Sequence, residues 1–143
     1  AHCSPKNFRP YNHEMVPVST CLVTGLPGAD KLAFITALAA ARPQGASWAL
    51  LDNDGGGSAH ALAQQDIPAE TVIGCACCTG QVTLQVGLVR LLRRARPQLL
   101  IIAADGAAEP EALEQTLHQP ELARAIIVVQ RICVAPPQWL AAL

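Results

Sequence analysis

The sequence predicts an α/β protein, a three-layer sandwich with a mainly parallel sheet and helices on both of its faces. Two observations lead to this fold class. Short apolar runs of strand length alternate along the chain with helix-forming segments, and polar turns separate them. In addition, 51% of the 143 residues are hydrophobic and only 3% are aromatic, which gives an aliphatic core suited to packed layers of helices and strands.

From the N-terminus, the first expected strand is the β-branched apolar run Val16–Thr24, which stops at a glycine. Helix-forming residues follow over Lys31–Ala41 and end before a proline. A short second strand at Trp48–Leu51 opens into the loop Asp52–Gly57, whose aspartates we expect to be turn residues rather than magnesium ligands. A third strand is expected at Thr71–Gly74.

The second half of the chain continues the alternation. Val82–Ala95 is expected to be a helix because its leucines recur on one face. Leu99–Ala104 is apolar throughout, as in a central strand of a parallel sheet. Pro110–Leu117 is expected to be helical because proline suits the first turn of a helix. A further strand is expected at Ala125–Val129 and a last helix at Trp139–Leu143.

Length and charge limit the domain count and the class of partner. Residues 1–15 are polar and aperiodic, so we expect a tail there, and residues 16–143 have the length of one compact domain. The net charge of −1 gives no reason to expect nucleic acid or an anionic membrane as a partner. The apolar runs are too short to span a bilayer. Four arginines at helical spacing indicate a solvated helix face: Arg90, Arg93, Arg94 and Arg96.

Between the first strand and the first helix lies a segment with the position of a phosphate loop. A working loop reads G-x-x-x-x-G-K-[ST]: its glycines let backbone amides approach phosphate, its lysine reaches the terminal phosphates and its hydroxyl holds magnesium. The candidate nucleotide-binding residues are Gly25, Gly28, Ala29, Asp30, Lys31 and Leu32. Asp30 stands in place of the second glycine, and Leu32 in place of the hydroxyl. A plain glycine turn before an amphipathic helix is the alternative.

Both replacements weaken the expected nucleotide site. Asp30 brings a negative charge to where phosphate would sit, and two unit charges ~5 Å apart at an effective dielectric of ~20 repel by roughly 3 kcal/mol. That energy corresponds to on the order of a hundredfold in affinity. Leu32 offers no ligand to magnesium. We therefore expect weak nucleotide binding and little hydrolysis. A self-filled loop, in which Asp30 occupies the phosphate position and pairs with Lys31, is an additional alternative.

Three of the six cysteines lie within four residues, at Cys75, Cys77 and Cys78. Adjacent cysteines pair poorly as disulfides, so this placement indicates a reducing, cytoplasmic compartment. Thiolates are strong zinc ligands, and Cys-x-Cys-Cys brings three of them close together. The fourth ligand is open between water, His60, His118 and an acidic residue. Thiols that only pack, or a redox pair, are the alternatives.

Taken together, these motifs resemble those of the CobW-type GTPases, a P-loop family of metallochaperones and cobalamin-synthesis proteins. Residues 17–31 are similar to the family opening P-V-T-V-L-T-G-F-L-G-A-G-K-T-T, and Asn53-Asp54 is similar to its N-E-F-G switch segment. Residues 74–79 match the family's G-C-I-C-C-T almost fully. Residues 103–110 fall where the family has E-T-S-G-L-A-x-P, but Ala103 replaces the acid, for which Asp105 is a candidate substitute.

The resemblance implies a P-loop NTPase-like fold and a GTP-driven protein that binds zinc or cobalt and hands it to a client protein. The altered phosphate loop and acidic motif lead us to expect a metal-binding domain with weak or absent GTP hydrolysis and no assignable catalytic residue. A competent GTP-hydrolysing metallochaperone and a non-enzymatic interaction module are the alternatives. The family's guanine-recognition motif and C-terminal domain would lie beyond residue 143. A sheet edge or face left exposed by the missing domain would allow either a homodimer or instability.

Overall fold

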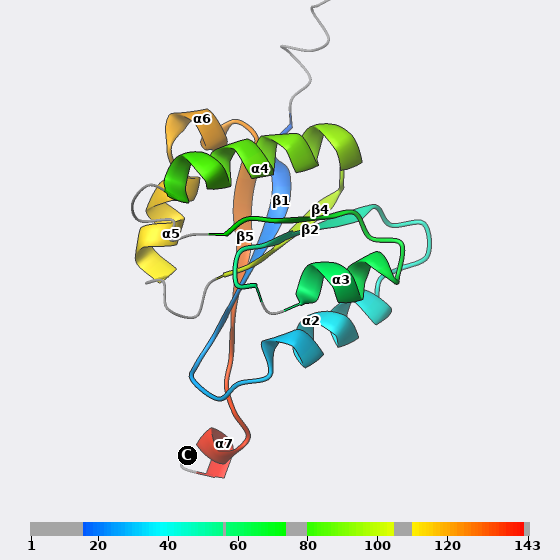
Figure 1. Ribbon diagram of the computed structural model, residues 1–143, viewed down its shortest axis with the longest axis vertical. Helices are drawn as coiled ribbons and strands as arrows, with labels where there is room; N and C mark the ends of the chain where they lie inside the picture. The colour runs from blue at the N-terminus through cyan, green and yellow to red at the C-terminus, as the bar shows by residue number, and fades with distance from the viewer. Residues whose placement is uncertain (1–15, 56, 74–79, 105–109, 142–143) are drawn as a thin grey trace, which may run out of the picture.

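A computed structural model describes residues 16–55, 57–73, 80–104 and 110–141, which form a sheet between two layers of helices (Figure 1). The sheet has five strands in the order β3-β2-β4-β1-β5, and every neighbouring pair is parallel. The strands are β1 (Val18–Gly25), β2 (Trp48–Asp52), β3 (Ala69–Thr71), β4 (Leu99–Ala103) and β5 (Ile126–Val134). The expected α/β fold class, P-loop NTPase-like with a parallel sheet, is confirmed.

Helices cover both faces of the sheet (Figure 1). One face carries α4 (Gly80–Ala95), α5 (Pro110–Leu117) and α6 (Pro120–Ala123), and the other carries α2 (Lys31–Ala40) and α3 (Ser58–Ala63). The short α7 (Gln138–Ala141) follows β5 and lies apart from the layers. Among the described residues, no helix combines the length and apolar character needed to cross a membrane.

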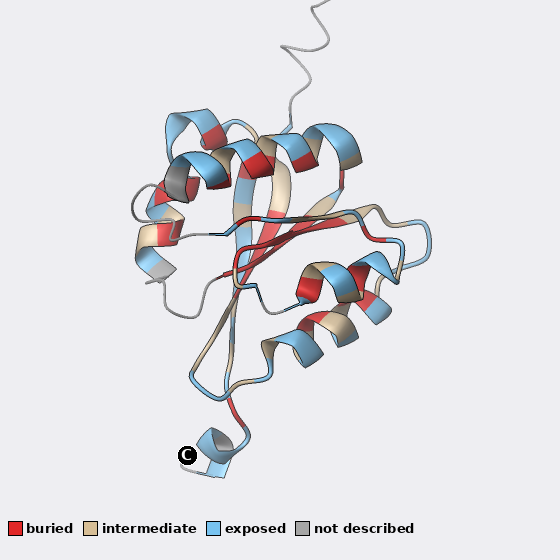
Figure 2. Ribbon diagram, viewed as in Figure 1, coloured by how far each residue is buried: buried red, intermediate tan, exposed pale blue. Residues whose placement is uncertain are grey.

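The core lies on both sides of the central strands, where Figure 2 shows the buried residues. Along β4, Leu100 and Ile102 pack in the cluster beneath α4, α5 and α6. Ile101 and Ala103 pack in the cluster beneath α2 and α3. All four are fully buried. Because successive side chains of a strand point to opposite faces, a strand covered on both sides has to be apolar throughout, as the sequence indicates.

The structure differs from the expected elements in four places. The third strand is Ala69–Thr71 rather than Thr71–Gly74, because it pairs with β2 and ends level with Asp52. Two short helices, α3 and α6, were not expected. The last strand runs to Val134, five residues beyond Val129, because β5 pairs with the whole length of β1 across one irregularity in register.

This topology places two polar loops at one edge of the sheet. The carboxyl ends of parallel strands share an edge, where such folds bind their ligands. The phosphate-loop segment follows β1 there, and the loop that begins at Asn53 follows β2. Since β4 lies between these two strands in the sheet, groups from all three strand ends can meet at this edge.

Candidate functional site: the phosphate-loop edge of the sheet

The chain leaves β1 in a tight turn. The Leu26 amide donates to the Val134 carbonyl at 2.9 Å, which extends the pairing of β1 with β5 by one residue. The Ala29 amide then donates to the Leu26 carbonyl at 3.0 Å, which closes a four-residue turn. Pro27 and Gly28 occupy its central positions, and Gly28 has φ +81°, which favours glycine. Two amides of the loop, those of Leu26 and Ala29, are therefore already used by the protein's own carbonyls.

Asp30 caps the helix that follows the turn. Its Oδ1 accepts a hydrogen bond from the Ala33 amide at 2.9 Å, at the N-terminus of α2. A helix N-terminus attracts anions because its first amides lack partners and its dipole is positive there. The Asp30 carboxylate is such an anion. The alternative in which Asp30 pairs with Lys31 is wrong, since the Asp30 carboxylate is directed to the helix amide and Lys31 has other partners.

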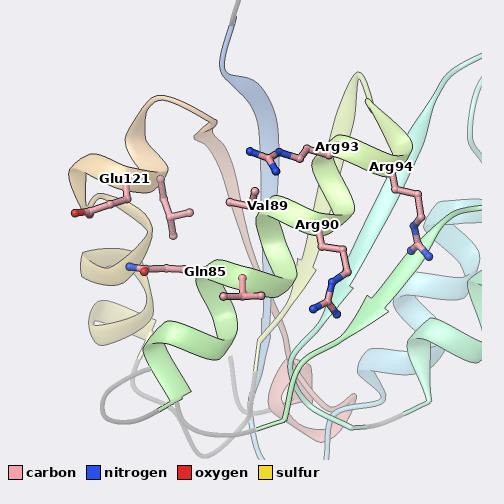
Figure 3. Close-up of a pocket in the computed structure, with 8 residues that line it drawn as sticks. Gln85, Val89, Arg90, Arg93, Arg94 and Glu121 are labelled. Carbon is pink, nitrogen blue, oxygen red and sulfur yellow. The ribbon is translucent and has the colours of Figure 1, made fainter. Parts of the chain in front are cut away.

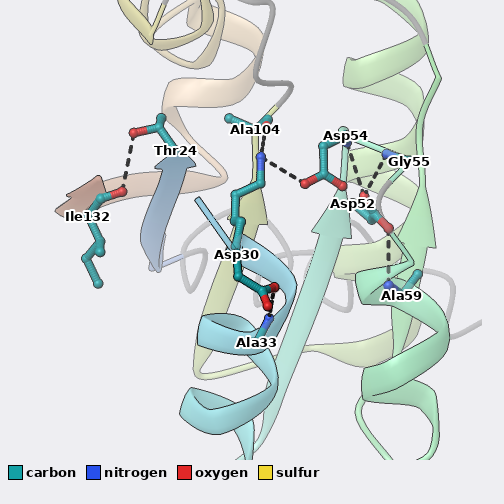
Figure 4. A network of polar contacts seen from close by, with 10 residues as sticks. Thr24, Asp30, Ala33, Asp52, Asp54, Gly55, Ala59, Ala104 and Ile132 are labelled. Atoms are coloured by element: carbon teal, nitrogen blue, oxygen red, sulfur yellow. Dashed lines mark hydrogen bonds and ion pairs between the residues drawn. The ribbon is translucent and has the colours of Figure 1, made fainter. Parts of the chain in front are cut away.

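Lys31 contacts two residues that follow other strands, Ala104 and Asp54, both labelled in Figure 4. Its ammonium group donates to the carbonyl oxygen of Ala104, directly after β4. It also lies 2.8 Å from Oδ2 of Asp54, in the loop after β2. The two side chains are only 12% and 11% exposed, so water screens this pair weakly. The lysine that a phosphate loop aims at phosphate is here paired with a carboxylate of the protein itself.

The loop that carries Asp54 is organised around the carboxylate of Asp52 (Figure 4). Oδ1 of Asp52 accepts from the amides of Asp54 and Gly55 at 3.1 and 3.2 Å, and Oδ2 accepts from the Ala59 amide at 3.1 Å. Asp52 is 1% exposed. Burial and then a hydrogen bond with the Asp54 carboxyl raise its pKa above the ordinary value, against the lowering effect of the amide bonds. Asp52 thus acts as the turn residue that its sequence context predicts.

The position after Lys31 is occupied by Leu32. Leu32 is 38% exposed and carries no hydroxyl for magnesium. The six predicted nucleotide-site residues do lie together around the end of β1. A Cβ on Gly25 would meet Lys31 and Ala29 only at ordinary contact distance. Sequence reasoning identified Lys31 but missed its partner Asp54, for which the signal was the match of Asn53-Asp54 to the family's switch segment.

The predicted metal ligands Cys75, Cys77 and Cys78 lie outside the described residues. The chain enters that segment from the same edge of the sheet, since the Val72 amide donates to the Asp52 carbonyl at 2.8 Å. In the ranges that the structure describes, no three His, Cys, Asp or Glu residues are grouped so as to hold a metal ion. His60 contacts Gln64, and His118 contacts the Glu114 carbonyl. Both histidines are exposed.

A shallow hollow of about 700 Å³ lies elsewhere, between α4 and α6 (Figure 3). Its apolar lining includes Val86, Val89 and Leu122. Arginines from the predicted basic cluster border it, and two of them, Arg90 and Arg94, pair with Glu70. None of the phosphate-loop residues lines this hollow, which is therefore separate from the candidate site around Lys31.

Two comparisons with known proteins place the chain among its relatives. Residues 19–139 match the family described as CobW/HypB/UreG, nucleotide-binding domain. The zinc chaperone YeiR of Escherichia coli (strain K12) is 32% identical over 125 residues, which are 85% of this chain and 38% of that protein. The chain therefore corresponds to little more than a third of the length of this relative.

Proposed function

The chain belongs to the CobW/HypB/UreG family of nucleotide-binding domains, and from that premise we propose that it is a zinc-handling module with little or no GTP hydrolysis. Zinc, or cobalt in its place, is the cargo, held by Cys75, Cys77 and Cys78 and passed to a client protein in a reducing compartment. The relationship to the zinc chaperone YeiR supports zinc as the first choice.

The observation that carries the loss of hydrolysis is the state of Lys31. Its ammonium group is bound to Asp54 and to the Ala104 carbonyl, while Asp30 caps the helix N-terminus at which a phosphate would be held. Both features that attract phosphate in a working loop are therefore satisfied internally. Without a hydroxyl at Leu32, magnesium also lacks its usual protein ligand.

The cysteine motif supports the metal role through its chemistry. Three thiolates form a strong site for zinc, and zinc prefers four ligands in a tetrahedral arrangement. A fourth position taken by water or by a client's side chain would let the ion leave, which suits transfer better than permanent structural binding. Thiolate ligands must be deprotonated, so binding should release protons and weaken as the pH falls.

Zinc titration of the reduced protein tests this proposal. We expect about one tight equivalent of zinc, measured by competition with a chromophoric chelator. The triple variant Cys75→Ser, Cys77→Ser, Cys78→Ser should lose this binding. Cys133→Ser is the matched control because Cys133 is exposed and lies on β5, outside the motif. Tight zinc binding that survives in the triple variant, or no tight binding in the parent protein, would contradict the metal role.

The same titration with GTP and magnesium present separates this proposal from a competent GTPase metallochaperone. We expect the zinc affinity to stay unchanged and GTP turnover to stay at background. Turnover that depends on magnesium and disappears in Lys31→Ala would instead establish a working GTPase.

A further inference from the structure

Asp54 and Lys31 meet although they belong to different loops. Lys31 begins α2, and Asp54 lies in the loop between β2 and α3. Their charged atoms are 2.8 Å apart and nearly buried. The contact involves Lys31, whose positive charge is the side-chain feature of a phosphate loop that attracts phosphate.

The geometry points to Asp54 as an internal anion that occupies the phosphate-binding position of Lys31, and to Asp52 as the positioning residue that holds Asp54 there. This inference rests on the proposed function, because it explains why a domain of this family would bind nucleotide weakly. Phosphate is then excluded by Asp54 in the loop after β2 as well as by Asp30 and Leu32 in the phosphate loop.

Asp52 can hold Asp54 in place because its carboxylate binds backbone amides in the loop and in the helix that follows the loop. The amides of Asp54 and Gly55 bond to one oxygen, and the Ala59 amide in α3 bonds to the other. Asp52 is itself buried at the end of β2, within the sheet. The Asp54 side chain therefore extends from an anchored turn rather than from a free loop.

The charges at this edge oppose a bound phosphate. The Asp54 carboxylate lies 2.8 Å from the ammonium group of Lys31 (Figure 4). A phosphate that reached Lys31 would have to displace the Asp54 carboxylate and then remain close to it. Like charges in a weakly screened position repel strongly. Removal of the charge at Asp54 should therefore strengthen phosphate binding, provided that Lys31 is present.

Isothermal titration with inorganic tripolyphosphate tests the role of Asp54, because this probe carries phosphates without a base or ribose. The reduced full chain is compared with Asp54→Asn, with Asp54→Asn/Lys31→Ala, and with Asp66→Asn. Asp66 lies outside the site and has φ +59°, a conformation that asparagine also tolerates. It thus matches the change in net charge at a place away from Lys31.

We expect Asp54→Asn to bind tripolyphosphate at least about tenfold more tightly than the parent protein, a step of about 1.4 kcal/mol. The gain should vanish in Asp54→Asn/Lys31→Ala, and Asp66→Asn should behave like the parent. The inference is overturned if Asp54→Asn binds no more tightly, or if its gain survives the loss of Lys31 or appears equally in Asp66→Asn.

A double-mutant cycle tests the positioning role of Asp52. Asp52→Asn should raise tripolyphosphate affinity in the parent protein. An asparagine side chain has only one accepting oxygen, so it cannot bind the amides of Asp54 and Gly55 through one oxygen and the Ala59 amide through a second. It should change nothing once Asp54→Asn is already present. A purely structural role predicts a loss of binding in both backgrounds, and that result would refute positioning by Asp52. Circular dichroism checks that each variant is folded, and the Asp54→Asn comparison stands if Asp52→Asn does not fold.

The failure of this inference is distinguishable from the failure of the proposed function. Cysteine-dependent zinc binding, read by chelator competition, does not depend on tripolyphosphate affinity. An unchanged affinity in Asp54→Asn would leave the zinc role intact and remove Asp54 from the explanation of weak nucleotide binding.

Discussion

Asp30 has two effects at the start of α2. It caps the helix, and it places a negative charge at the helix N-terminus. As the capping residue it satisfies the Ala33 amide, one of the amides that a helix leaves unpaired at its N-terminus. As a carboxylate it adds negative charge where an anion would otherwise bind. The first property needs only a side-chain oxygen, whereas the second needs the charge, so substitution can separate them.

Asp30→Asn and Asp30→Ala should therefore have different effects. Asparagine caps a helix about as well as aspartate, so Asp30→Asn should keep the free energy of unfolding while tripolyphosphate binding becomes tighter. Asp30→Ala should lower the free energy of unfolding by about 1 kcal/mol, the usual effect of removing a cap. Urea unfolding and isothermal titration measure the two effects. Equal destabilisation by both substitutions would show that the Asp30 oxygen does not act as a cap.

At the scale of single residues, the sequence predicts the role of a residue when that role depends only on residues close to it in the chain. The place of Lys31 follows from its spacing to Gly25, and the turn role of Asp52 follows from the glycines after it. The pairing of Lys31 with Asp54 depends on which strand ends lie next to each other, and hence on the strand order. The metal ligation by the cysteines stays a prediction, since they lie outside the described residues.

At the scale of elements, α4 packs closely against the chain just after β3. Gly87, in the middle of α4, allows this approach: a Cβ there would lie 2.5 Å from Cγ2 of Val72. Val72 is 3% exposed and β-branched, so its side chain has little freedom to turn away. Alanine normally strengthens a helix by up to about 1 kcal/mol relative to glycine, but here the close contact opposes that gain.

Gly87→Ala should lower the free energy of unfolding by about 1–3 kcal/mol, the usual range for overpacking of a core. In a Val72→Ala background the contact is absent, so the same substitution should be neutral or stabilising. Urea unfolding followed by circular dichroism gives all four values of this cycle. If Gly87→Ala stabilised the parent protein, helix propensity would outweigh the contact and the packing argument would be wrong.

The helix α3 and the extra length of β5, which the sequence did not predict, have a weak local signal. The N-cap of α3 is Gly57, at φ +88° and without a side-chain cap bond, so none of the usual capping side chains marks that helix. The extra length of β5 depends on its pairing with β1, which no local pattern encodes. Helices and strands with a clear period or a continuous apolar run, such as α4 and β4, were placed to within two residues.

At the scale of the whole molecule, an ion pair joins the edge of the sheet to the helical layer. Arg131, on the edge strand β5, donates through Nε and Nη2 to the carboxylate of Glu114 on α5, with Nη2 to Oε2 at 3.0 Å. This bidentate bond to Arg131 holds the pKa of Glu114 below its ordinary value, with partial burial acting the other way. The pair therefore links the ionisation of one carboxyl group to the folding of the domain.

The sign of this linkage sets the expected response to acid. A carboxyl group whose pKa is lower in the folded state stabilises that state above its unfolded pKa, about 4.3 for glutamate. The stabilisation disappears as the pH falls through the folded value. We expect the difference in urea midpoint between the parent protein and Glu114→Gln to be largest near neutral pH and to shrink below about pH 4. Asp52, whose raised pKa acts in the opposite direction, contributes to both proteins and cancels.

Arg131→Gln should show the same pH dependence as Glu114→Gln, and adding one substitution to the other should change the urea midpoint little further. A difference that stays constant from about pH 7 to about pH 3 would mean that the pair does not hold the edge strand to the helices through charge.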